Sequence, residues 1–377
     1  MDLRHKVHFI NFCRKMAVNA VFFLIPLHFL KVGFNGWQIG TIVSLYALMP
    51  LLVTFPTGWV NDRLAIVQVI RGALLVNGLV FLGLSLTQNF VLTALLIAVF
   101  GATNSILDVS TNNLYYKDER EDNLNRKFGM LSFWLNLGTS LGTILGGVLI
   151  FLSGFRMMFY ALAALMVVTF LAVRRFGDEK FEMIPLREYR LSFFRRKALL
   201  LTLMLFIVAL HWGVEGTVYS PFLREAFKLN SFQVALYIGL ALFVMALAAL
   251  WVSRREFDPV LNRRLFLTGM FMSGLGMMLM TVPNVYLSFL ARATHEAGDG
   301  LMGALVTIFI SRLFERRNIG GNAGLLLGIF TLGNMVGAQL FSPLGYSLGL
   351  QVPFLIAGAL LVLDCGFGYI VFKKVAY

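Results

Sequence analysis

Four ionisable side chains fall at helical spacing inside one apolar segment of the chain. Residues 291–300 read ARATHEAGDG, and the ionisable members of this stretch are Arg292, His295, Glu296 and Asp299. Steps of three and four residues place all four on one face of a helix. A charged side chain at mid-bilayer costs at least ~2.5–3.5 kcal/mol on insertion scales, so these groups must face a partner or a water-filled cavity.

These residue types suit ion pairing and proton binding. Arg292 and Glu296 are one helical turn apart and can pair, as can His295 and Asp299. Desolvation raises the pKa of a carboxyl group and a nearby cation lowers it, so an acid that changes partners can take up and release a proton. Histidine can relay protons near neutral pH. Arg292 could alternatively hold an anionic group of a solute.

Other chemistries lack their sequence signatures. There is no Gly-x-x-x-x-Gly-Lys-Ser/Thr loop for ATP, and no nucleophile–base spacing stands out. His295-Glu296 begins like the helix motif of zinc proteases, but residue 299 is Asp where that motif requires a second His. We therefore expect no enzyme, no metal site and no cofactor, with a proton gradient as the energy source.

The composition requires a membrane to surround these groups. The chain has 377 residues, 58% hydrophobic and 14% charged, whereas soluble domains carry about 25% charged residues. Apolar blocks recur at the length of roughly 20 residues that a bilayer demands of a helix. The sequence predicts an all-α integral membrane protein with twelve spans at about 8–30, 36–60, 66–87, 91–113, 128–152, 157–173, 198–220, 231–252, 265–283, 286–311, 323–345 and 352–372.

Basic residues gather on one side of the predicted membrane. Of the 32 Lys and Arg residues, 27 fall on the side of the two termini, four fall on the other side, and Arg292 lies inside a span. By the positive-inside rule both termini are cytoplasmic. The net charge of +13 is then a topology signal, and we expect no nucleic-acid partner. We expect a monomeric multi-pass protein in a bacterial-type cytoplasmic (inner) membrane, in contact with membrane lipids.

The two halves of the chain match each other at a constant offset of 195 residues. The matched pairs are Pro26 and Pro221, Asn35 and Asn230, Gln38 and Gln233, Asn89 and Asn284, Gly129 and Gly324, Leu137 and Leu332, Gly138 and Gly333, and Gly142 and Gly337. Internal repeats are a known transporter design. We predict two pseudo-symmetric six-helix bundles, residues 1–173 and 198–377, joined by a basic cytoplasmic linker, residues 174–197.

The twelve-span layout, the six-plus-six repeat and the long linker resemble the major facilitator superfamily. After the second span the sequence GWVNDRL is similar to the loop signature of that superfamily, through Gly58, Asp62 and Arg63. The Gly-Arg-Lys continuation of the signature is absent, since Ala-Ile-Val stands there. The resemblance implies a gating role for these three residues.

A glycine row in the fifth span is similar to the antiporter-type pattern of the same superfamily. The sequence reads GTSLGTILGG, with Thr143 in the position of the proline. Small residues on one helix face allow another backbone to approach closely. The glycines of this row are Gly138, Gly142, Gly146 and Gly147. They could serve helix packing, sliding between the two halves during transport, or both.

The resemblance also places spans 1, 4, 7 and 10 around a central cavity. Glu215 in span 7 and Arg292 in span 10 match in depth and can meet, as can Arg14 in span 1 and Asp108 in span 4. For Arg14 we expect snorkelling to the interface. The candidate residues for proton coupling and the substrate cavity are Arg292, His295, Glu296, Asp299, His211, Glu215, Asp108, Arg14 and Asn19.

The sequence thus favours a secondary active transporter that works by alternating access. The preferred hypothesis is proton antiport that exports a small organic or amphipathic solute. One alternative is proton symport that imports an anionic or sugar-like nutrient through Arg292. Another, from a different class, is a membrane sensor or scaffold without transport.

Overall fold

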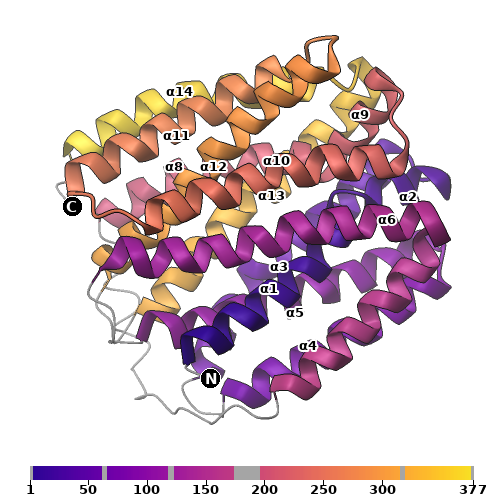
Figure 1. Cartoon of the computed structure of the whole chain (residues 1–377), viewed down its shortest axis with the longest axis horizontal. Helices are drawn as coiled ribbons and strands as arrows, with labels where there is room; N and C mark the ends of the chain where they lie inside the picture. Colours follow the sequence, from indigo (N-terminus) through magenta and orange to yellow (C-terminus); the bar gives the residue numbers. More distant parts are fainter. Residues whose placement is uncertain (1–2, 62–65, 118–122, 174–195, 315–318, 375–377) are drawn as a thin grey trace.

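The computed structural model is a bundle of long α-helices (Figure 1) and describes residues 3–61, 66–117, 123–173, 196–314 and 319–374. In that part of the chain no strand occurs. The helices are α1 (Leu3–Phe22), α2 (Ile25–Lys31), α3 (Gly36–Asn61), α4 (Ile66–Leu86), α5 (Phe90–Lys117), α6 (Leu124–Val173), α8 (Arg196–Thr217), α9 (Tyr219–Phe227), α10 (Ser231–Ser253), α11 (Pro259–Leu279), α12 (Val285–Leu313), α13 (Ile319–Leu348) and α14 (Val352–Lys374).

The lengths of these helices suit a membrane protein and confirm the expected fold class. Nine candidate spans among the described residues are long and apolar enough to cross a bilayer. One of them, α6, has 50 residues and contains a break at Gly154, where φ is 79° and ψ is 174°, so it provides two spans. Helices α11 and α12 have 21 and 29 residues, which is also long enough to cross a bilayer. When α6 is counted as two spans and α11 and α12 are included, the described helices agree with the predicted layout of twelve spans.

Two predicted spans are broken helices rather than continuous ones. The first changes from α1 to α2 at Leu24, and the seventh changes from α8 to α9 at Val218. Pro26 and Pro221, matched in the sequence repeat, each lie just after the break. Proline lacks a backbone N–H and disrupts an uninterrupted helix, which accounts for a break at the same place in each half.

Other matched residues of the repeat begin equivalent helices. Asn35 and Gln38 exchange side-chain-to-backbone hydrogen bonds of 2.9 and 3.0 Å before α3. Asn230 and Gln233 exchange equivalent bonds of 2.9 Å before α10. Each is a reciprocal cap that satisfies two otherwise unpaired N–H groups at a helix start. The repeat therefore encodes the same local structure twice.

The glycine row brings helix backbones together within each half. A Cβ atom at Gly142 would collide with the backbone of α1, and one at Gly337 would collide with the backbone of α8. In the first half the glycines and the α1 carbonyls they face are Gly138 with Phe12, Gly142 with Met16, and Gly146 with Ala20. Gly147 instead faces Ala235 of α10, in the other half.

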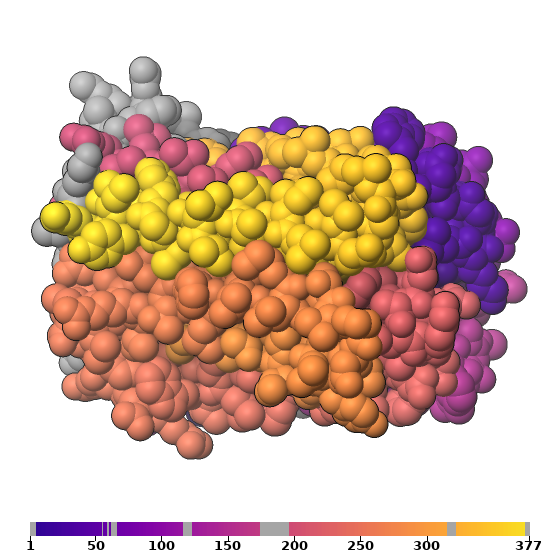
Figure 2. Space-filling view, turned by 90° about the horizontal axis from the view of Figure 1, so that it is seen from above, coloured from indigo at the N-terminus to yellow at the C-terminus, as the bar shows by residue number. Residues whose placement is uncertain are grey.

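Helices α6 with α10 and α3 with α13 form the principal contacts between the two parts of the chain. In Figure 1 the first part is indigo to magenta and the second is salmon to yellow, and α14 ends toward the left. We call this end, where α1 also begins, the terminal side, and the opposite end the distal side. In Figure 2 α14 lies along the orange helices of the second part, and first-part residues appear at the right edge.

Candidate functional site

A cavity of about 430 Å³ lies between the two parts of the bundle. Its first-part wall includes Lys15, Asn19 and Asp108, and aromatic side chains such as Trp212 and Phe330 contribute from the second part. The ionisable residues that line its second-part wall are His211, Glu215, Glu296 and Asp299. The intramembrane acids therefore border a space large enough for a small organic molecule.

The cavity extends from mid-bundle toward the terminal side. Asn113 and Thr307, near the terminal-side ends of α5 and α12, belong to its lining. On the distal side the two parts are packed together: a Cβ at Gly216 would contact Phe22, and the Ser342 hydroxyl donates to the Gly36 carbonyl at 2.6 Å. The lining and the packing together describe a chamber that is closed toward the distal side.

Arg292 forms the centre of an ion cluster beside this chamber. Its Nη1 lies 2.5 Å from Oε1 of Glu215 on α8, and its Nη2 pairs with Glu296 one turn along α12. Both pairs expected from the sequence are thus present. The Arg292 side chain is fully buried, lies over the Tyr219 ring with Cζ 4.3 Å from the ring centroid, and is not among the residues that line the cavity.

Two histidines join the remaining acid to the cluster. His211 Nε2 lies 3.1 Å from Oδ2 of Asp299, and His295 Nε2 lies 2.9 Å from Oε1 of Glu215 and 3.7 Å from Oδ2 of Asp299. Their ring centroids are 5.3 Å apart. The predicted pair of His295 with Asp299 is therefore present. The shorter contact of His295 is with Glu215, because α8 and α12 approach each other at that depth.

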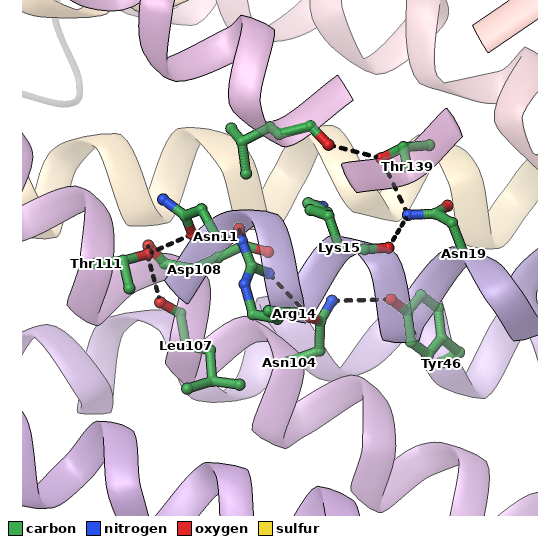
Figure 3. A network of polar contacts seen from close by, with 11 residues as sticks. Asn11, Arg14, Lys15, Asn19, Tyr46, Asn104, Leu107, Asp108, Thr111 and Thr139 are labelled. Atoms are coloured by element: carbon green, nitrogen blue, oxygen red, sulfur yellow. Dashed lines mark hydrogen bonds and ion pairs between the residues drawn. The ribbon is translucent and has the colours of Figure 1, made fainter. Parts of the chain in front are cut away.

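A second buried network lies across the cavity, and it shows that the expectation for Arg14 is wrong. Figure 3 shows the Arg14 guanidinium directed at Asn104 and Asp108 rather than toward an interface, with distances of 2.8 and 2.6 Å. The side chain is 1% exposed. Asn11 also accepts from Arg14 at 3.0 Å. A carboxylate and two amides satisfy the charge inside the bundle, so snorkelling is unnecessary.

Asn19 lies beside this network and has a structural role that sequence reasoning left open. Its amide donates to the Lys15 carbonyl at 2.9 Å and to the Thr139 hydroxyl at 3.1 Å (Figure 3). It therefore links α1 to α6 while lining the cavity.

The gating motif is only partly described by the structure. Gly58 is buried on α3, whereas Asp62 and Arg63 lie outside the described residues. The expected linker, residues 174–197, lies outside them apart from its last two residues.

Several residues in the cavity wall or next to the ion cluster were not predicted from the sequence. Lys15 is adjacent to Arg14 in a predicted span and could have been found by the intramembrane-charge rule. Tyr46, which accepts from the Asn104 amide at 2.9 Å, carries no such signal. Nor does Tyr219 beneath Arg292, because an aromatic residue in an apolar span usually serves packing.

The cluster also has the spacing of a metal-binding site. Donor atoms of His211, His295 and Asp299 lie within 4.8 Å of one another, and those of Glu215, His295 and Glu296 form a second such group. The absence of a metal stays a prediction from the sequence.

Comparisons with known proteins agree with this architecture. The model of the family described as Major Facilitator Superfamily matches residues 7–261. An uncharacterized MFS-type transporter of Methanocaldococcus jannaschii is 22% identical in an alignment of length 361 that covers 90% of each chain.

Solved structures share the fold at low sequence identity. The human organic anion transporter MFSD10 (TETRAN) superposes with a TM-score of 0.75 and 15% identity, covering 98% of this chain and 100% of its own. The nucleoside transporter NupG gives 0.75 and 13%, with 99% and 100% covered. A bacterial homologue of the human lysosomal transporter Spinster, solved inward-facing and unoccupied, gives 0.74 and 14%, with 99% and 96% covered.

The helical bundle, the cavity between its two parts and the family match across most of the chain lead to one conclusion. The chain belongs to the Major Facilitator Superfamily and is a multi-pass membrane transporter, not an enzyme.

Proposed function

We propose that this transporter couples the movement of a small organic solute to protons. The observation that carries the proposal is the placement of three acids, Glu215, Glu296 and Asp299, on the wall of the chamber that would hold the solute. Their counter-charge, Arg292, is buried behind them. Buried ionisable groups in membrane spans are costly and usually mark substrate or proton pathways.

The contact geometry supplies a mechanism for the coupling. Glu215 on α8 and Glu296 on α12 share the single guanidinium of Arg292. A movement of α8 relative to α12 would take one acid away from Arg292, and an acid that loses its cation favours the protonated form. Alternating access would then expose the acid and the solute to each side in turn.

The chamber wall suits an amphipathic solute. Trp212 and Phe330 make an edge-to-face aromatic pair with ring centroids 4.7 Å apart and border the chamber. Asn19 and Asn334 provide amides on opposite parts of the wall. Aromatic faces with a few polar groups are typical of small-molecule sites.

Antiport is the preferred mode of coupling: the solute is exported while protons enter. The acids that would bind the proton also line the solute chamber, so protonation and solute binding can exclude one another at one place. In this scheme residues 1–173 and 198–377 rock as two halves about α6–α10 and α3–α13, joined by residues 174–197. The protein is a monomer in the cytoplasmic membrane, and the chamber opens toward cytoplasmic termini.

One observation favours symport of an anionic solute as the second candidate. Lys15 lines the chamber, and its ammonium makes no ion pair with another described residue. An anionic group could bind there, whereas Arg292 is already engaged by two acids.

Transport in reconstituted vesicles tests the proposal. Ligands are first found by thermal shift, because a binder raises apparent stability by mass action, and uptake is then measured under an imposed pH gradient. Antiport predicts that a gradient acid on the side opposite the solute accelerates uptake, and symport predicts the reverse. Glu296→Gln should abolish the acceleration, while Glu225→Gln, an exposed distal-side change, should retain it. Flux of a bound solute that ignores the gradient would contradict the proposal.

A further inference from the structure

Each histidine of the cluster is held by an acceptor at both ring nitrogens. For His211 the partners are the Val208 carbonyl at Nδ1, 2.5 Å away, and Asp299 at Nε2, 3.1 Å away. For His295 they are the Ser273 carbonyl at Nδ1, 2.8 Å away, and Glu215 at Nε2, 2.9 Å away. Both rings therefore have the same arrangement: a backbone carbonyl at Nδ1 and a carboxyl oxygen at Nε2.

This arrangement fixes the number of hydrogens. A carbonyl oxygen can only accept, so each Nδ1 must carry a hydrogen. An ionised carboxylate also only accepts, so each Nε2–carboxylate contact needs a second hydrogen. Neutral imidazole has one N–H hydrogen, and here Nδ1 carries it. Without an added proton, the lone pair of each Nε2 would therefore face a lone pair of the carboxylate oxygen. Free imidazole holds a proton about two pH units more strongly than a free carboxylate, which assigns the added proton to the ring.

The charge of the cluster supports the same count. Three carboxylates, on Glu215, Glu296 and Asp299, face one permanent cation, Arg292. The cluster would carry a charge of −2 with neutral rings and would be neutral with two imidazolium rings. His295 and His211 are 0% and 1% exposed, and an uncompensated charge at such depth is strongly unfavourable.

No further charged group is available to balance the cluster among the described residues that face it. The phenol of Tyr219 lies beneath Arg292, and the phenol of Tyr237 on α10 hydrogen-bonds with Ser288 at 2.7 Å. From α11 the neighbour is Ser273, whose hydroxyl lies 3.0 Å from His295 Nδ1. Protons on the rings or on the carboxyl groups, or a cation between the donors, would balance the acids. The contacts at Nδ1 and Nε2 assign these protons to the rings.

We propose that His211 and His295 form a two-proton site, with one transferable proton in the His211–Asp299 contact and one in the His295–Glu215 contact. This inference rests on the proposed proton coupling and assigns its number and place. Release breaks the Nε2–H bond of an imidazolium and gives the proton to cavity water, leaving a neutral ring beside a carboxylate. His211 and Asp299 border the cavity and His295 does not. The proton of the His211–Asp299 contact therefore leaves before the proton of the His295–Glu215 contact.

Nitrogen NMR of the purified full chain labelled with 15N-histidine tests the proposal. The chain has five histidines, and His211→Gln and His295→Gln identify the two signals. We expect both rings to show two protonated nitrogens near neutral pH. Each variant should remove one of the two imidazolium signals. His28→Gln, at a ring that packs on Phe155 with centroids 4.8 Å apart, should leave both unchanged.

The wild-type spectrum alone decides the count if a variant fails to fold. A bare Nε2 on either ring near neutral pH would overturn the proposal. So would a stoichiometric divalent metal found by elemental analysis, whose removal by chelator changes these signals, because a dication at the three donors balances the same charge. Two imidazolium rings without proton-driven flux would overturn the proposed function, whereas flux with a bare Nε2 would leave that function standing and reject the histidines as carriers.

Discussion

The guanidinium of Arg292 lies 2.5 Å from the carboxylate of Glu215, and this contact joins α12 to α8. Neither side chain is exposed by more than 7%, and Glu215 borders the cavity whereas Arg292 does not. The acid therefore stands between its counter-charge and the cavity that extends toward the terminal side.

Removal of Arg292 should cost much of the stability of the protein. Arg292→Met leaves Glu215 and Glu296 buried without their cation, a change that typically costs about 3–5 kcal/mol. We expect a clear fall in the thermal transition of the detergent-solubilised protein. Arg224→Met, at an exposed distal position, is the matched control and should change little. Equal transitions for the two variants would show that the cluster contributes nothing to stability.

Exchange of the two charges should restore part of what either single reversal loses. Glu215→Arg or Arg292→Glu alone places like charges together at mid-bundle, whereas the double variant renews an opposite-charge contact between α8 and α12. Recovery should be incomplete, because Glu296 would then lie one turn from a glutamate. Thermal stability measured as a double-mutant cycle gives the coupling. Additive losses would show that the two residues do not interact.

The glycine seam should tolerate no side chain. In Gly142→Ala the new methyl group would meet the Met16 carbonyl of α1, and such overpacking typically costs about 1–3 kcal/mol. Gly72→Ala is the control, because a Cβ there has nothing within 4 Å and alanine improves helix propensity by up to ~1 kcal/mol. Thermal unfolding of both variants measures the difference. A Gly142→Ala protein as stable as the control would refute the close approach of α6 and α1.

A cross-link between α3 and α13 should stop transport if these two helices move relative to each other when the halves rock. A Cβ at Gly324 would lie 3.5 Å from Cβ of Thr54, within the range of about 3.5–4.5 Å found in disulfides. In a protein with Cys13 and Cys365 replaced by Ala, Thr54→Cys with Gly324→Cys should oxidise readily and block flux. Reduction should restore flux, and each single-cysteine variant should be insensitive to oxidant. Full flux in the oxidised form would reject rocking at this contact.

Thiol labelling should reveal the orientation in the membrane. Arg156→Cys and Arg224→Cys, both at exposed distal positions, should react with an impermeant maleimide in intact cells. Arg255→Cys, exposed on the terminal side, should react only after lysis, because the positive-inside rule places that side in the cytoplasm. The reverse pattern would invert the proposed topology.

Features that depend on residues close together in the chain could be predicted from the sequence alone. Apolar length defined the spans, and helical spacing placed Arg292 one turn from Glu296, a contact the structure contains. The repeated Asn and Gln residues predicted equivalent positions, and these became equivalent helix caps before α3 and α10. Such features follow from backbone geometry over a few residues, so they can be predicted from the sequence without knowledge of the neighbouring helices.

The side-chain contacts between different helices, in contrast, became known only from the three-dimensional structure. Depth along the spans allowed Glu215 to reach Arg292. The additional contact of His295 with Glu215, the burial of Arg14 by Asn104 and Asp108, and the exposure of Lys15 to the cavity depend on how each helix is rotated about its axis. A rotation of one residue, about 100°, turns a side chain from a cavity to a neighbouring helix. That rotation is set by close backbone contacts such as those of Gly142 and Gly337, which join segments far apart in the chain.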